Sequence, residues 1–217
     1  MKILFDCDGT LLDSMFVWEK PYKELFKKYN YIPTKEEYDE IQSYGMSEFC
    51  EFVINKFNLK LSKREVSKKI YKVIEYGYKN DVKPKNGIVD FLDKLYEKNI
   101  EMAVTSSSDL KLLDVVFEKY KMNKYFKFIL TPDSSGLLKS EKEYWLKAMK
   151  LLNSDPKSTI LFDDASYAIK TAKSVGIYTI GVKDLPYNEK EIPILEEIAD
   201  ELLDNVTYFD INSIKNF

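Results

Sequence analysis

The stretch FDCDGTLLDS at residues 5–14 joins a short apolar run to two aspartates, Asp6 and Asp8, and then to a glycine and a threonine. The apolar residues 3–5 predict a buried β-strand. Residues i and i+2 of a strand project from the same face, so both carboxylates leave the end of this strand together. Two like charges side by side are unfavourable unless a cation or a proton is shared between them. We therefore expect a functional site at this strand end.

The chain contains no histidine, and this excludes several kinds of active site. A Ser-His-Asp triad, a Cys-His nucleophile pair, a phosphohistidine intermediate and a His-ligated zinc all require that side chain. Cys7 and Cys50 are too few and too far apart for a disulfide framework or a zinc knuckle, and we expect Cys7 to fill the core. The chemistry must therefore come from carboxylates, lysines, hydroxyl groups or a hard metal with oxygen ligands.

With 217 residues, the chain is long enough to form one large or two modest domains. Its net charge of -3 and the lack of a basic stripe argue against nucleic-acid binding. No apolar run approaches the ~20 residues of a membrane span, and the sequence starts directly with the predicted strand. We therefore expect no membrane association, no targeting segment and a cytoplasmic location. The oligomeric state is left open, and a monomer is compatible with the sequence.

Residues 16–80 form a lysine- and tyrosine-rich block with helical periodicity and no strand pattern. Thr34 and Ser62 are each followed three residues later by a glutamate, which matches the capping box at the start of a helix. A further amphipathic helix is predicted to begin after Gly45. These signals indicate a small module built only from helices.

From residue 83 onward, amphipathic helices alternate with short apolar strands, after the turn-rich segment KPKNG at 83–87. Buried strands that alternate with helices are typical of a doubly wound parallel sheet in an α/β fold. The segment 191–206 predicts a closing helix. We therefore predict an α/β core over residues 1–14 and 83–217, into which a small α-helical cap domain, residues 15–82, is inserted.

Polar residues follow several of the predicted strands, and in parallel α/β sheets functional groups collect at those strand ends. They are Asp6 and Asp8, Thr105 and Ser106, and Asp163 and Asp164. Lys139 stands just before a helix for which Ser140 is the predicted N-cap and Glu143 completes a capping box. Carboxylates suit Mg²⁺, while hydroxyl groups and a lysine suit phosphoryl oxygens. The combination favours phosphoryl transfer over glycoside or peptide hydrolysis.

Together these residues resemble the four motifs of the haloacid dehalogenase superfamily. The matching segments are DCDGT at 6–10, Thr105, Lys139 before a helix, and the Asp163–Asp164 pair. KSEKEYWLKA and DDASYAIKTAKSVGI resemble the surroundings of the third and fourth motifs, although Ser140 and Lys142 stand where prolines are usual. KPKNGIVDFLDKL is similar to the return from a helical cap. The resemblance covers nearly the whole chain and implies the subfamily with a cap after the first motif, which includes phosphoglycolate phosphatases and β-phosphoglucomutases.

The resemblance implies that Asp6 is a nucleophile that forms an aspartyl-phosphate. It implies that Asp8 is the general acid that protonates the leaving oxygen and then the base that activates water. A metal beside Asp6 keeps that carboxylate ionised, while repulsion between like charges raises the pKa of Asp8 so that it can hold a proton.

The remaining motif residues are implied ligands. Mg²⁺ would be held by Asp6, the backbone carbonyl of Asp8 and Asp164, with Asp163 nearby as an outer partner or occasional ligand. Phosphoryl oxygens would be held by Thr105, Lys139 and the backbone amides of Ser106 and Gly9.

We expect a phosphomonoesterase that acts on a small phosphorylated metabolite. A β-phosphoglucomutase-like mutase is an alternative, but Glu48 and its neighbours supply no basic residues for a second phosphate. A phosphonatase would need a cap lysine that forms a Schiff base. Because the cap contains many lysines, their presence does not test this alternative. A phosphoryl-accepting regulatory module would not need Asp8. An interaction scaffold would use the tyrosines of the cap, which we interpret as packing residues (Tyr71, Tyr76 and Tyr78).

Overall fold

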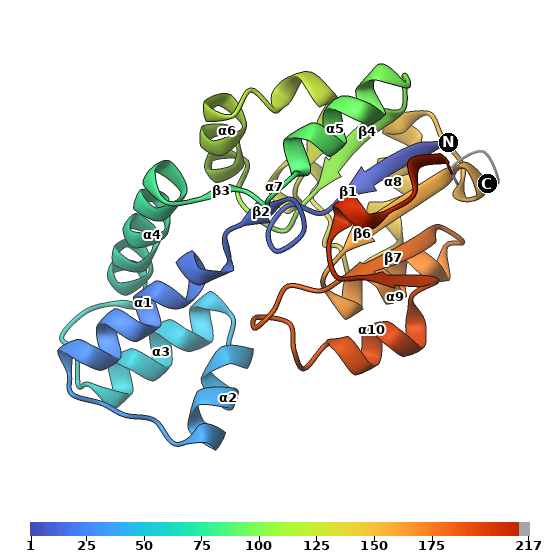
Figure 1. The fold of residues 1–217 in the computed structure, drawn as a ribbon. Coiled ribbons are helices and arrows are strands. Elements are labelled where there is room, and N and C mark those ends of the chain that lie inside the picture. The colour runs from blue at the N-terminus through green and yellow to red at the C-terminus, as the bar shows by residue number, and fades with distance from the viewer. Residues whose placement is uncertain (213–217) are drawn as a thin grey trace. The chain divides into compact units, whose positions relative to one another are not determined.

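The computed structural model describes residues 1–212, apart from the side chains of residues 39, 42 and 43. Residues 213–217, which the sequence assigns to the core, lie outside the described part. The chain divides into two compact units, a discontinuous one made of Met1–Met15 and Val82–Phe217 and a continuous one made of Phe16–Asp81 (Figure 1). Among the described residues, no helix combines the length and apolar character needed to cross a membrane.

The unit over Phe16–Asp81 is built from helices, as the periodicity of the sequence predicts. They are α1 (Met15–Lys28), α2 (Lys35–Ser43), α3 (Met46–Lys56) and α4 (Lys63–Asn80). Both predicted capping boxes are confirmed, because the hydroxyl groups of Thr34 and Ser62 each accept a hydrogen bond from the backbone three residues later. Helix α3 begins directly after Gly45, whose N–H donates to the Glu48 carboxylate at 2.8 Å.

Helices α1 and α4 approach each other closely within this unit. A Cβ atom on Gly77 would lie 2.5 Å from Cγ1 of Val17, so only glycine fits at this crossing. At the next position of each helix, the indole N–H of Trp18 donates to the Tyr78 hydroxyl at 3.1 Å. Tyr78 is fully buried, as predicted for a packing residue, whereas Tyr76 is 62% exposed, so that prediction is wrong for Tyr76.

The discontinuous unit contains a six-stranded parallel sheet with the strand order β5-β4-β1-β6-β7-β8. Its strands are β1 (Lys2–Phe5), β4 (Glu101–Thr105), β5 (Phe126–Leu130), β6 (Thr159–Asp163), β7 (Tyr178–Val182) and β8 (Glu201–Leu203). A separate antiparallel pair joins β2 (Leu12–Asp13) to β3 (Lys83–Pro84). The helices are α5 (Ile88–Glu97), α6 (Leu110–Lys119), α7 (Pro132–Ser135), α8 (Lys142–Leu152), α9 (Ser166–Ser174) and α10 (Ile192–Ile198), with short 3₁₀ turns at Asn123–Tyr125, Pro156–Ser158 and Val206–Tyr208. The predicted doubly wound α/β class is confirmed.

Strand β1 lies in the middle of the sheet because its residues are apolar on both faces. Ile3, Leu4 and Phe5 are all fully buried, and the Phe5 ring stacks on Phe162 at 5.0 Å between centroids. Since β1 is parallel to both β4 and β6, the carboxyl ends of the three strands meet at one edge of the sheet (Figure 1).

The predicted closing helix over 191–206 is wrong in its second half. Helix α10 ends at Ile198, and the chain then forms β8 beside β7. The carboxylate of Asp200 accepts hydrogen bonds from the N–H and hydroxyl of Thr179 at 2.8 and 2.9 Å, which fixes the chain at the start of this pairing. Pairing with β7 at the edge of the sheet thus outweighs the local helical pattern of this segment.

Candidate active site

The first group of polar side chains follows β1. Asp6 is 6% exposed, and its backbone N–H donates to the Phe162 carbonyl of β6 at 2.8 Å. Cys7 is buried, as predicted for a core filler, and burial raises its pKa well above the ordinary value. The carboxylate of Asp8 accepts hydrogen bonds from the hydroxyls of Ser14 at 2.6 Å and Ser108 at 2.5 Å. Asp6 and Asp8 therefore have different surroundings, one buried and charge-paired, the other held by hydroxyl groups.

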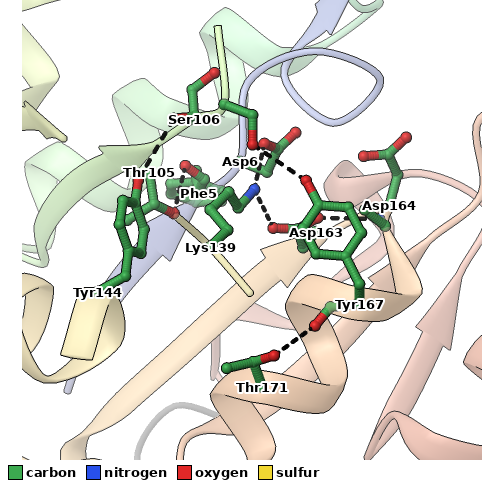
Figure 2. Close-up of polar contacts among 12 residues, drawn as sticks. Phe5, Asp6, Thr105, Ser106, Lys139, Tyr144, Asp163, Asp164, Tyr167 and Thr171 are labelled. Carbon is green, nitrogen blue, oxygen red and sulfur yellow. Dashed lines mark hydrogen bonds and ion pairs between the residues drawn. The ribbon is translucent and has the colours of Figure 1, made fainter. Parts of the chain in front are cut away.

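Lys139 lies wholly inside the protein. Figure 2 shows its ammonium group between two carboxylates, 2.7 Å from Oδ1 of Asp6 and 2.5 Å from Oδ2 of Asp163. The indole N–H of Trp145 donates to the Lys139 carbonyl at 2.8 Å, which holds the backbone in place. Burial alone would lower the pKa of Lys139, but the charges of Asp163 and Asp6 raise it well above its usual range. The lysine is therefore a permanent cation at the centre of the site.

The predicted capping box at Ser140 and Glu143 is wrong. Helix α8 begins at Lys142 with Glu141 as its N-cap, and no side chain caps it. The carboxylate of Glu141 instead accepts a hydrogen bond from the Leu138 N–H at 2.6 Å and closes a turn around Lys139. Lys139 thus enters the site from this turn, not from the first turn of a helix.

The carboxylates after β6 complete an acidic cluster. Asp6, Asp163 and Asp164 each place one carboxylate oxygen within 4.8 Å of the others. Burial raises the pKa of Asp163 to about 7, although Lys139 opposes the shift, and burial also raises the pKa of Asp164 well above its usual value. Three carboxylates face a single lysine, so the cluster is favourable only with further positive charge or protons.

This cluster fits a divalent cation such as Mg²⁺. Oδ2 of Asp6 is buried and has no hydrogen-bond partner among the described residues. A buried carboxylate oxygen without a partner is unfavourable, and a bound cation would satisfy it. All candidate ligands are oxygen atoms, which Mg²⁺ prefers.

The predicted phosphate-binding groups differ in whether they already have hydrogen-bond partners. The Thr105 hydroxyl is buried and lies 3.4 Å from the Phe5 carbonyl (Figure 2). The N–H groups of Ser106 and Gly9 already donate to the carbonyls of Leu130 and Leu12, at 3.0 and 3.1 Å. Both amides are therefore engaged in backbone hydrogen bonds in this structure, and neither is available to a ligand. Ser106 still offers its hydroxyl group, which accepts from the Ser108 N–H at 3.0 Å.

Gly9 has a different role, because it leaves space for Asp164. Its φ of +83° lies in the left-handed region, and a Cβ atom there would be 2.4 Å from Oδ2 of Asp164.

We expect Gly9→Ala to displace Asp164 and to weaken Mg²⁺ binding by about tenfold or more. Titration calorimetry with Mg²⁺ measures this. Gly136→Ala is the matched control, because Gly136 also has a positive φ of +70° but has open space around it. Equal Mg²⁺ affinities for Gly9→Ala and the wild type would contradict the assignment.

Several residues of the site were not singled out from the sequence. Asp184 follows β7 as the other aspartates follow their strands, so the same strand-end argument applies to it. Lys85, from the turn-rich segment after residue 82, forms an ion pair with Asp184 at 2.8 Å and also donates to the Gly9 carbonyl. Asn188 donates to the Asp164 carbonyl at 3.1 Å and accepts from the Asp184 N–H at 2.8 Å. Local sequence patterns carry no signal for Lys85 and Asn188.

Residues 3–182 match the family model of the haloacid dehalogenase-like hydrolases. A phosphorylated carbohydrates phosphatase of Thermotoga maritima is 22% identical over 178 residues, which cover 82% of this chain and 82% of that protein. A phosphoglycolate phosphatase of Aquifex aeolicus is 29% identical over 184 residues, again 82% of each chain. The β-phosphoglucomutase structure from Clostridium difficile is similar with a TM-score of 0.69 at 20% identity, over 99% of this chain and 95% of the other. This structural likeness shows the same fold.

Proposed function

Because the chain belongs to the haloacid dehalogenase-like hydrolases, we propose that it is a Mg²⁺-dependent phosphatase of a small phosphorylated metabolite, with Asp6 as nucleophile. The observation that carries this proposal is the buried Asp6 carboxylate, which Lys139 contacts through one oxygen while the other oxygen has no hydrogen-bond partner within the described part of the chain. A buried carboxylate that is held in place is suited to nucleophilic attack, and its two oxygens allow it to contact a cation and the phosphorus atom at the same time.

In the first step, the Asp6 carboxylate attacks the phosphorus atom, the bond from phosphorus to the ester oxygen breaks, and an aspartyl-phosphate forms. Asp8 transfers its proton to the leaving oxygen, so the product departs as an alcohol. In the second step, Asp8 takes a proton from a water molecule whose oxygen attacks phosphorus. The Asp6 carboxylate then leaves, and inorganic phosphate is released. The hydroxyls of Ser14 and Ser108, which contact both Asp8 oxygens, keep this side chain oriented.

The other residues stabilise charge. Asp6, the Asp8 carbonyl and Asp164 would hold Mg²⁺, with Asp163 beside them and paired to Lys139. When bound, Mg²⁺ supplies positive charge that offsets the charges of the carboxylates and the phosphoryl group. Lys139 adds a fixed cation next to the attacking carboxylate, and the hydroxyls of Thr105 and Ser106 are the candidate donors to phosphoryl oxygens.

We assign substrate selection to the helical unit over Phe16–Asp81, as a cap domain. Support for the substrate class comes from the relatives named for phosphorylated carbohydrates and for phosphoglycolate. A mutase must also hold a second phosphate. Glu48 of this unit is acidic, and its carboxylate accepts a hydrogen bond from the Gly45 N–H at the start of helix α3. We therefore favour hydrolysis over phosphoryl transfer between sugar positions.

The test is release of phosphate from an aryl phosphate such as p-nitrophenyl phosphate, measured with Mg²⁺ and with EDTA. We expect many turnovers per protein molecule with Mg²⁺ and none with EDTA. A panel of sugar phosphates, nucleotides and phosphoglycolate would then identify the preferred substrate. Release of one p-nitrophenol per protein without free phosphate would instead indicate a phosphoryl-accepting module, and phosphate release unaffected by EDTA would contradict the metal assignment.

A further inference from the structure

A fourth carboxylate lies beside the acidic cluster. Asp184 follows β7, the neighbour of β6 in the sheet, and is only 7% exposed. One of its oxygens, Oδ1, pairs with Lys85 at 2.8 Å, whereas Oδ2 is buried and has no hydrogen-bond partner among the described residues. Asp184 therefore has one satisfied oxygen and one that is available to a ligand.

The free oxygen of Asp184 is directed at the cluster. A Cβ atom on Gly9 would lie 3.0 Å from Oδ2 of Asp184 and 2.4 Å from Oδ2 of Asp164, so both oxygens face the same small space above this glycine. Asn188 holds the two residues in this arrangement, since its side chain bonds to the backbone of both. Two carboxylates directed at one space are favourable only when a cation lies close to them.

The lysines near the cluster do not supply the cation that Asp164 and Asp184 require. Lys139 is paired with Asp6 and Asp163, and among residues 1–212 no lysine or arginine forms an ion pair with Asp164. The ammonium group of Lys85 pairs with Oδ1 of Asp184, not with the partnerless Oδ2, and donates to the Gly9 carbonyl. Lys85 and Asp184 also line a cavity of about 520 Å³.

We infer that Asp184 is a positioning carboxylate of the metal site, which helps to hold Mg²⁺ through the water ligands of the ion, and that Lys85 limits this attraction. Mg²⁺ characteristically keeps several waters, and carboxylates around its ligands strengthen binding through hydrogen bonds and charge. The inference rests on the proposed function, because it requires that the cluster of Asp6, Asp163 and Asp164 binds Mg²⁺.

Titration calorimetry with Mg²⁺ on the full chain tests the inference. We expect Asp184→Asn to weaken Mg²⁺ binding by about tenfold to a hundredfold. Lys85→Met should strengthen binding, because it removes the positive charge closest to Asp184. Asp204→Asn is the control and should match the wild type, because Asp204 lines the same cavity but forms an exposed pair with Lys183. Circular dichroism in EDTA confirms that each variant is folded.

The two variants are expected to change Mg²⁺ affinity in opposite directions, and this distinguishes the inference from a purely structural role of Lys85 and Asp184. If Lys85 and Asp184 only clamp the Gly9 loop, both variants should weaken Mg²⁺ binding, and this result would overturn the inference. Unchanged affinity in Asp184→Asn would overturn it too. If Asp184→Asn does not fold, Lys85→Met decides alone, because only tighter binding supports the inference. A wild-type protein that does not bind Mg²⁺ would overturn the proposed metal site itself, whereas the variant results bear on Asp184 alone.

Discussion

Asp6→Asn is expected to lower the turnover number on any substrate by on the order of 10⁴-fold or more. The amide oxygen of asparagine is neutral and cannot form the aspartyl-phosphate, so the first chemical step is lost. The fold should persist, because Lys139 keeps its ion pair with Asp163 at 2.5 Å. Steady-state assays of phosphate release, together with thermal unfolding, measure both expectations.

Asp133→Asn provides the control for this substitution. Asp133 also follows a strand of the sheet, but it is exposed in the short helix α7 and is not part of the acidic cluster of Asp6, Asp163 and Asp164. Its variant should turn over at the wild-type rate. An Asp6→Asn protein that retained a substantial fraction of wild-type turnover would show that another group attacks the phosphorus atom.

Lys139→Met is expected to have the largest effect on stability, a loss of about 3–5 kcal/mol in the metal-free protein. Methionine fills a similar volume but leaves the buried carboxylates of Asp6 and Asp163 without their cation. Because a bound divalent ion supplies replacement charge, Mg²⁺ should raise the unfolding temperature of this variant more than that of the wild type. Activity should fall as well, since the fixed charge near the reacting phosphoryl group is lost.

Urea unfolding in EDTA and in Mg²⁺ measures the stability change. Lys183→Met serves as the comparison, because Lys183 forms an exposed ion pair with Asp204 at 2.9 Å and its removal should change stability little. Equal stabilities for Lys139→Met and the wild type in EDTA would show that the buried carboxylates do not depend on the lysine for their charge balance.

The sequence predicts well those features whose causes are local or periodic. The capping boxes at Thr34 and Ser62 depend on residues three positions apart, and they form as expected. The apolar run before Asp6 becomes the central strand because it is apolar on both faces. The convergence of Asp6, Asp163 and Asp164 follows from the parallel sheet, because parallel neighbouring strands end at the same edge.

The features that were missed depend on tertiary contacts or on local side-chain geometry, neither of which hydrophobic periodicity encodes. Strand β8 exists because Asp200 and Thr179 bring that segment to the edge of the sheet, which no local pattern reveals. Glu141 displaces Ser140 as the N-cap because its side chain turns back to Leu138. The contact of Lys85 with Asp184 spans 99 positions of the chain, so charge and spacing alone could not pair them.

The aspartyl-phosphate on Asp6 is the central claim, and trapping it is the most direct test. Borohydride reduces an acyl phosphate to an alcohol, so a reaction quenched during turnover with Mg²⁺ should convert aspartate at position 6 into homoserine. Mass spectrometry of the peptide that contains residues 5–14 distinguishes positions 6 and 8. We predict homoserine at position 6, dependent on substrate and absent in Asp6→Asn. Turnover without any modified aspartate, or with the modification at position 8, would contradict the proposed mechanism.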